Sequence, residues 1–124
     1  MKKFIYPLQG VLNLKEKLES QEKVLFQAAM EELRREEEAL SQLEQRKRGY
    51  EDRLREAVTS QLDLLKVKTN KEAIEVLKEL IQQQIGKVRR AERHAEVARK
   101  RLEEAIKERK TLEIGLWLYN IDKL

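Results

Sequence analysis

The second half of the chain repeats an apolar residue every three or four positions over more than six heptads. From Ile74 to Tyr119, fourteen positions follow one another in alternating steps of three and four, and twelve of them are apolar, the exceptions being Gln84 and Arg109. A sustained 3.5-residue repeat is typical of a helix that supercoils against another helix. The repeat therefore predicts one long helix with a single narrow apolar stripe, which we call its seam.

The first half carries a second and less regular seam. One set of positions spans the N-terminal part, with Lys15 and Glu22 as polar defects: Phe4, Leu8, Val11, Leu18 and Leu25. Another set follows, with Glu36, Lys47 and Gln61 as defects: Leu33, Leu40, Leu43, Tyr50, Leu54, Ala57 and Leu64. The two sets join through Leu25, Ala29 and Leu33 in two steps of four, a stutter that would locally unwind a supercoil.

A short polar stretch, 66–71, separates the two seams. Thr69 followed by Glu72 fits a capping box, in which the two residues satisfy each other's backbone amides at a helix start. Two long helices joined by a short break favour an antiparallel hairpin. We predict an all-α, single-domain coiled-coil hairpin over 1–124, with a helix over about 7–66, a turn over about 67–70 and a helix over about 71–121.

A turn near residue 68 predicts which residues face each other. Leu33, Leu40 and Leu43 would then lie opposite Ala105, Ala98 and Ala95, so that large side chains meet small ones. The same register sets Gly49 and Gly86 level with each other. Each glycine costs about 1 kcal/mol against alanine in a helix, which predicts a weak point there.

Composition argues against most enzyme classes. The chain has no cysteine and one histidine, so a thiol nucleophile is excluded and a protein metal site is not expected. Its carboxylates are numerous, but two helices form no cleft that would shift their pKa values for acid–base catalysis. The four glycines are isolated and make no phosphate-binding loop. We expect no enzyme activity, no cofactor and no small-molecule ligand.

The net charge of +4 is mild, and nucleic acid is the weaker of the binding hypotheses. The stretch from Lys87 to Arg101 is basic, but acidic residues are interleaved and no aromatic residue lies between 51 and 116 to stack on bases. The longest uncharged run, Phe4 to Leu14, is too short to span a bilayer. We expect a cytoplasmic protein.

Aromatic and aliphatic residues gather near both termini, which a hairpin brings to the same end. Phe4, Tyr6 and Leu8 come from one helix, and Leu116, Trp117 and Leu118 from the other. They either cap the seam or form a socket for a partner, because their number exceeds what one stripe can bury.

The N-terminal residues resemble the opening of the FliJ family of flagellar export proteins. The pattern is aromatic, x, aromatic, x, Leu, then Val-Leu, x, Leu, basic, Glu, and it is matched by Phe4, Tyr6, Leu8, Val11, Leu12, Leu14, Lys15 and Glu16. The Glu-rich first helix and the return helix ending in Arg109-Lys110-x-Leu112-Glu113 are also similar, so the resemblance covers essentially the whole chain.

The resemblance implies a stalk in the bacterial flagellar type III export apparatus, with roles in flagellum assembly, motility and chemotaxis. Family members are similar to the central stalk of rotary ATPases, bind the hexameric export ATPase, and contact the membrane export gate and export chaperones. The resemblance also implies a location at the inner face of the membrane at the flagellar base. Residues at the open end would enter the ATPase ring: Phe4, Tyr6, Leu8, Val11, Leu116 and Trp117.

Gate contacts in the family lie on apolar side chains along the hairpin, which suggests Leu43, Tyr50 and Leu77 here. The heptad pattern places all three in the seam, in conflict with a docking role. The alternative function is a generic structural coiled coil or a stalk subunit of another secretion or rotary ATPase.

Overall fold

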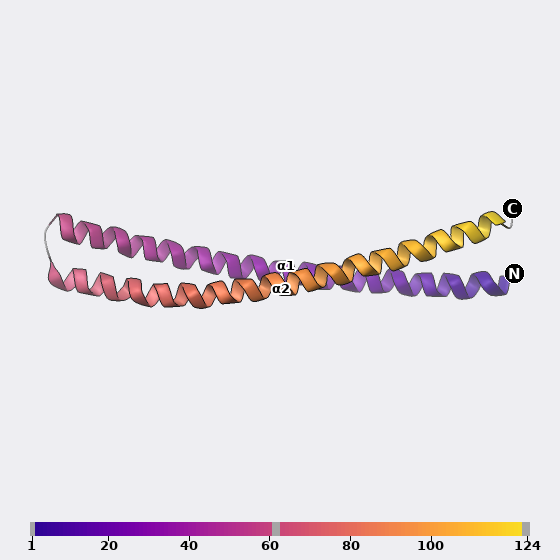
Figure 1. Ribbon diagram of the computed structural model, residues 1–124, viewed down its shortest axis with the longest axis horizontal. Coiled ribbons are helices and arrows are strands. Elements are labelled where there is room, and N and C mark those ends of the chain that lie inside the picture. The colour runs from indigo at the N-terminus through magenta and orange to yellow at the C-terminus, as the bar shows by residue number, and fades with distance from the viewer. Residues whose placement is uncertain (1, 61–62, 123–124) are drawn as a thin grey trace. The chain divides into compact units, whose positions relative to one another are not determined.

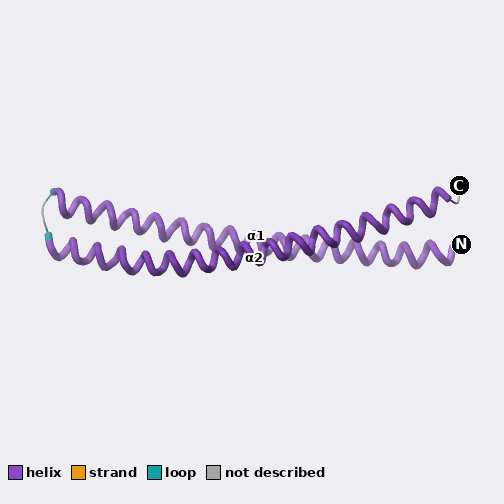
Figure 2. The backbone as a smooth tube through the Cα atoms, in the orientation of Figure 1, coloured by secondary structure: helices purple, strands orange, loops and turns teal. Residues whose placement is uncertain are grey.

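The chain folds as a helical hairpin, as the sequence predicts. The computed structural model describes residues 2–60 and 63–122, and side chains from residue 8 onward. Helix α1 spans Lys2–Thr59 and helix α2 spans Leu64–Asp122, and together they contain all of the secondary structure in the described residues (Figures 1 and 2). Two long helices packed against each other make up the fold.

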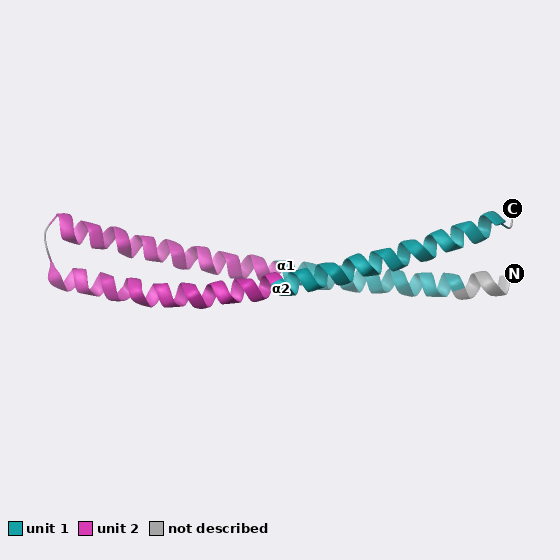
Figure 3. Ribbon diagram, in the orientation of Figure 1, with its two compact units in different colours: residues 1–30, 93–124 teal, residues 31–92 magenta. Residues whose placement is uncertain are grey.

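The hairpin divides into two compact units, each made from a segment of both helices (Figure 3). The turn unit comprises residues 31–92, and the terminal unit comprises residues 1–30 and 93–124. In each unit the segments of α1 and α2 lie side by side and run in opposite directions.

The predicted α2 seam is confirmed over its whole length. All fourteen positions are buried or half-buried, and every buried residue in the described part of α2 belongs to this seam. Ile74, Leu77, Val88 and Ala91 form it in the turn unit, while Ala95, Ala98 and Leu116 do so in the terminal unit. Burying a Leu or Ile completely contributes roughly 1.5–3 kcal/mol, so this stripe is the main source of stability.

The α1 seam runs without the predicted stutter. Half-buried or buried positions alternate in steps of three and four throughout: Leu8, Leu12, Lys15, Glu19, Glu22, Phe26, Ala29, Leu33, Glu36, Leu40, Leu43, Lys47, Tyr50, Leu54 and Ala57. From Leu33 to Ala57 this is the predicted set. Before Ala29 the predicted Val11, Leu18 and Leu25 are replaced in the seam by the residues that follow them, Leu12, Glu19 and Phe26.

Helix α1 ends at Thr59 and α2 begins at Leu64, so the break between the two helices comes before the turn predicted at 67–70. Asp63 caps α2: its Oδ1 accepts hydrogen bonds from the amides of Leu65 (3.1 Å) and Lys66 (3.3 Å), and its carbonyl accepts one from Val67 (3.0 Å). At the end of α1 the Ser60 hydroxyl donates to the Glu56 carbonyl (2.7 Å). Asp is at least as good an N-cap as Thr. Because α2 begins directly after Asp63, Thr69 lies inside the helix and does not cap it.

The earlier turn shifts the register by two heptads. The predicted turn would set Lys15 opposite Asp122, whereas its ammonium lies 3.0 Å from the Glu108 carboxylate, fourteen residues earlier. Within the turn unit, Glu36 contacts Gln84 instead of lying opposite Arg101, so the register that predicted the pairing of Leu33, Leu40 and Leu43 with Ala105, Ala98 and Ala95 is wrong. Moving a heptad pattern by whole heptads still sets apolar on apolar residues, so the periodicity alone could not choose.

A buried polar contact fixes the register in the turn unit. Gln84 is 7% exposed, and its side-chain amide donates to the backbone carbonyl of Glu36 (2.9 Å) and to the Glu36 carboxylate (2.8 Å). Gly86 therefore lies near the level of Glu36, while Gly49 lies thirteen residues along α1, roughly 20 Å away at 1.5 Å per residue. The two glycines do not coincide, and the predicted shared weak point is wrong.

Replacing either glycine with alanine should stabilise the hairpin. A Cβ at Gly49 or at Gly86 would meet nothing within 4 Å, so only the backbone entropy changes. We expect G49A and G86A each to raise the free energy of unfolding by about 1 kcal/mol, measured by urea denaturation followed by far-UV circular dichroism. The exposed Ala28 supplies the control, since A28G should lower the free energy of unfolding by a similar amount. Unchanged or reduced stability in G86A would contradict the open environment of that helix face.

The cap at Asp63 can be tested against the predicted cap at Thr69. D63A removes the acceptor for two α2 amides and should lower the free energy of unfolding by about 1 kcal/mol. T69A changes an exposed residue inside the helix and should alter it by less than about 0.5 kcal/mol. The same urea titration measures both. A larger loss in T69A than in D63A would place the turn where the capping box predicted it.

Candidate functional site

The terminal unit carries an open apolar groove between α1 and α2. Its volume is about 620 Å³. The lining combines aliphatic and aromatic side chains with the stems of charged ones: Leu8, Val11, Lys15, Glu104, Lys107, Glu108, Thr111, Leu112, Gly115, Leu116 and Tyr119. Beneath the groove, Leu12 and Leu116 are both buried. The groove exists because the side chains along this part of the hairpin do not fill the space between the two helices.

Charged residues pair across α1 and α2 at the groove and next to it. Lys15 pairs with Glu108 at 3.0 Å, and Arg109, a seam residue of α2, donates to Glu19 and, at 2.9 Å, to Glu113. The hydrogen bonds that Arg109 donates to Glu19 and then to Glu113 raise the pKa of its guanidinium. An arginine in a seam needs such a partner, because a partly buried charge without one is destabilising.

This arginine explains why the predicted α1 seam is wrong before Ala29. The sequence favours Leu18 for the seam because it is apolar, yet Glu19 occupies the position that faces Arg109. Leu12 and Phe26 take the equivalent positions one heptad to either side. The seam here is partly ionic, and it is imperfect, since the Oε2 atom of Glu22 is buried and accepts no hydrogen bond from any described residue.

Because Glu19 rather than Leu18 faces α2, a second and apolar stripe of α1 faces solvent. Val11, Leu14, Leu18 and Leu25 are all exposed, Leu14 to 54%. They follow the same three-and-four spacing as a seam. Between residues 11 and 25, all of which the structure describes, Leu12 is the one apolar side chain of α1 that is buried.

Helix α2 adds exposed apolar side chains near its end. Ile114, Trp117, Leu118 and Ile121 share one helical face, and Trp117 is 62% exposed. Large apolar patches on a protein surface mark interaction sites. The groove, the α1 stripe and this α2 face together form the terminal surface, and we take it as the candidate site.

Comparison with protein families decides the relationship. The model of the flagellar FliJ protein family matches residues 3–114. The chain belongs to this family. No curated protein and no solved structure gives a significant match. FliJ proteins are components of flagellar protein export and are not known as enzymes, so membership identifies the chain as an export component.

The structure describes four of the six residues that the FliJ resemblance suggests for ATPase contact. Leu8, Val11 and Leu116 line the groove, although Leu116 is mostly buried beneath it. Trp117 lies on the exposed face of α2 rather than in the groove. Phe4 and Tyr6 lie outside the residues whose side chains the structure describes.

The three residues suggested for gate contact lie in the seam of the turn unit. Leu43 and Tyr50 are half-buried, and the Arg53 guanidinium lies over the Tyr50 ring, 5.0 Å from its centroid. Leu77 is 3% exposed. It packs between the helices, so a direct contact with a partner is available only to Leu43 and Tyr50 while the helices stay paired.

Sequence reasoning missed the outward orientation of Leu14 and Leu18. The heptad pattern places Leu18 in the seam, and Leu14 enters the sequence analysis only as part of the family motif. The signal that could have found them is Arg109: a cation in the α2 seam requires a carboxylate opposite, and Glu19 is adjacent to Leu18.

Two classes of site are not found in the described part of the chain. There is no group of three or more His, Cys, Asp or Glu side chains that could hold a metal ion. None of the described helices is long and apolar enough to cross a membrane.

Matched substitutions can show which of the two stripes of α1 packs against α2. Leu12 is 8% exposed and Leu14 is 54% exposed, and they are the same residue type two positions apart. We expect L12A to lower the free energy of unfolding by about 2 kcal/mol and L14A by less than about 0.5 kcal/mol, measured by thermal and urea unfolding. The reverse order would show that the apolar stripe, and not the ionic one, faces α2.

Proposed function

We propose that this protein is a non-enzymatic stalk of the flagellar export apparatus whose terminal surface binds the export ATPase hexamer. The observation that carries the proposal is the exposed apolar surface of the terminal unit, on both α1 and α2, in a chain of the FliJ family. An exposed tryptophan such as Trp117 is among the residues that most often anchor a protein interface, and the exposed aliphatic side chains around it gain free energy when a partner covers them.

The terminal surface suits the inside of a ring. Its apolar residues occur on both helices, with Leu14 and Leu18 on α1 and Trp117 and Leu118 on α2. A helix pair that is apolar on several faces can be contacted by several subunits at once. Binding would rest on packing, and the chain would contribute no covalent chemistry.

The turn unit would link the ATPase to the membrane export gate. We infer that Leu43 and Tyr50 supply the gate contact, because they are half-buried at the edge of the seam, while Leu77 supports them from α2. Export chaperones would bind as further partners. This function places the protein in the cytoplasm, at the inner face of the membrane beneath the flagellum.

The single tryptophan gives a direct test of the proposed ATPase contact. Full-length protein labelled with 5-fluorotryptophan contains one fluorinated residue, Trp117. We expect its fluorine resonance to shift and broaden on addition of the purified export ATPase hexamer, and the ATP turnover of the hexamer to rise. The variant L14S/L18S should weaken binding by about tenfold, because two interface leucines lose their apolar contact.

V76S is the matched control for this experiment. Val76 is as exposed as the terminal residues but belongs to the turn unit, so V76S should bind the hexamer as the parent does. Unchanged ATP turnover together with an unshifted Trp117 resonance would exclude the stalk function. A resonance that shifts equally in L14S/L18S would place the contact on another face.

A further inference from the structure

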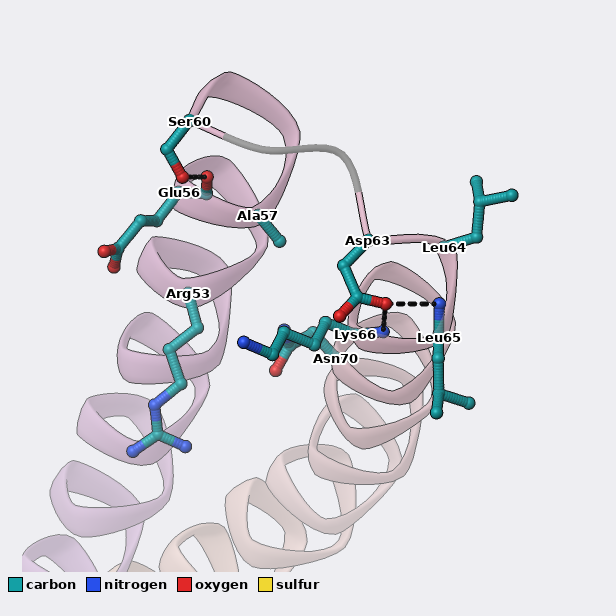
Figure 4. Close-up of a pocket in the computed structure, with 9 residues that line it drawn as sticks. All are labelled: Arg53, Glu56, Ala57, Ser60, Asp63, Leu64, Leu65, Lys66 and Asn70. Atoms are coloured by element: carbon teal, nitrogen blue, oxygen red, sulfur yellow. Dashed lines mark hydrogen bonds between the residues drawn. The ribbon is translucent and has the colours of Figure 1, made fainter.

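The chain carries two start signals for its second helix, and the observed hairpin uses one of them. Asp63 caps α2, with its carboxylate at the amides of Leu65 and Lys66 (Figure 4). Six residues later, Thr69 and Glu72 have the spacing of a capping box, yet both lie exposed inside α2. The sequence therefore also contains the start of a shorter second helix.

The α1 seam likewise continues past the end of α1. The helix ends at Thr59, but the heptad spacing of its seam runs from Leu54 and Ala57 on to Leu64. In the observed hairpin Leu64 belongs to α2, is 73% exposed and lies on the side of α2 that faces away from α1 (Figure 4). If α1 continued to about residue 66, Leu64 would occupy a seam position. A longer first helix thus gives this exposed leucine a place between the helices.

The apolar residues of the two seams are compatible with both arrangements. Extending α1 from Thr59 to residue 66 lengthens it by seven residues. In a hairpin built that way, each residue of α2 would meet an α1 residue fourteen positions farther along, which is two complete heptads. Seam positions would still meet seam positions. Apolar packing alone therefore does not choose between the two registers.

The buried glutamine of α2 does distinguish them. In the observed hairpin the Gln84 side-chain amide donates to the Glu36 carboxylate (2.8 Å) and to the Glu36 backbone carbonyl (2.9 Å). Tyr50 lies fourteen residues after Glu36 and would take its place in the second register. A backbone carbonyl is present in either register, but the carboxylate is not. Gln84 would lose its charged acceptor, and a buried polar group without its partner is destabilising.

The arginine in the α2 seam distinguishes them in the same way. Arg109 donates to Glu19 across the helices and to Glu113 within α2. Leu33 lies fourteen residues after Glu19 and would take its place. The guanidinium would keep Glu113 but would face a leucine across the seam. A partly buried charge that loses a carboxylate partner disfavours the second register.

We propose that the chain encodes two hairpins that differ by two heptads, and that Gln84 and Arg109 select the observed one. In the second hairpin, the first helix would continue to about residue 66 and Thr69 would cap the second helix. A polar residue at a single seam position is a known means of specifying the register of a coiled coil, at a cost in stability. The proposal does not depend on the proposed function.

Sliding between the two registers would alter both ends of the hairpin. At the turn it would bring Leu64 into the seam. In the terminal unit it would displace Leu8 and Val11 relative to Leu116 by fourteen residues, roughly 21 Å at 1.5 Å per residue. The groove of the terminal surface therefore exists only in the observed register, and a partner that fills it favours that register.

Spin labels can report the register, because the sequence contains no cysteine. Ser41 and Glu79 are exposed, and each lies five residues toward the turn from the Glu36–Gln84 contact. We expect full-length S41C/E79C, labelled with nitroxides, to give a single distance by double electron–electron resonance. Adding Q84L/R109L should produce a second and longer distance in about 10% of molecules or more, because the second register displaces the labels by roughly 21 Å along the helices.

Substitutions of the two caps identify the second hairpin. With Q84L/R109L present, D63A should raise the ratio of the long distance to the short one about fivefold, because it removes the cap of the observed α2. T69A should lower the same ratio about fivefold, because it removes the cap of the shorter helix. General fraying of the helices would not respond to the two caps in opposite directions.

The matched control replaces the same residue types where they are exposed. Gln82 and Arg101 face solvent, so Q82L/R101L should give the parent distance alone. Circular dichroism should show that all variants remain helical. The proposal is overturned if the parent shows both distances, if Q84L/R109L shows only the parent distance, or if the ratio does not respond to T69A.

Discussion

The hairpin depends on burying one narrow stripe from each helix against the other. A helix rich in charged residues has little to gain from tertiary structure except along such a stripe. Among the residues whose side chains are described, only Leu12, Ala57 and Gln84 are buried besides apolar residues of the α2 seam. With so few buried groups, each polar contact within the seam has a large influence on geometry. The Gln84–Glu36 and Arg109–Glu19 contacts are therefore decisive for how α1 faces α2 in their respective units.

The heptad periodicity predicted the seam correctly wherever apolar residues alone determine which face of a helix is buried. The α2 seam and the α1 seam from Leu33 onward belong to this class. The turn was misplaced because Thr69 and Glu72 form a complete capping pattern, whereas Asp63 caps α2 with its own carboxylate and has lysine, not glutamate, three positions later. The register error followed directly, because a heptad repeat is unchanged by a shift of two heptads.

The candidate site was predicted in part for a similar reason. Leu8, Val11 and Leu116 were identified because they lie in the repeat at the chain ends, and they do line one groove. Leu14 and Leu18 could not be assigned from hydrophobicity, which draws such residues toward the core. Their outward position follows from a pairwise constraint, the need of Arg109 for Glu19, and a single-residue pattern does not contain such constraints.

An ionic seam beside an exposed apolar stripe makes physical sense in a protein that must bind partners. Leucines in the seam would hold the helices more tightly, but α1 would then have fewer apolar groups to offer outside. Charge pairs such as Lys15–Glu108 contribute little to stability when partly exposed, yet they set a defined geometry. In the terminal unit, Leu14 and Leu18 therefore lie on the surface of the hairpin, where a partner can contact them, while Glu19 occupies the seam. Binding there would recover, in the complex, stabilisation that the free chain lacks.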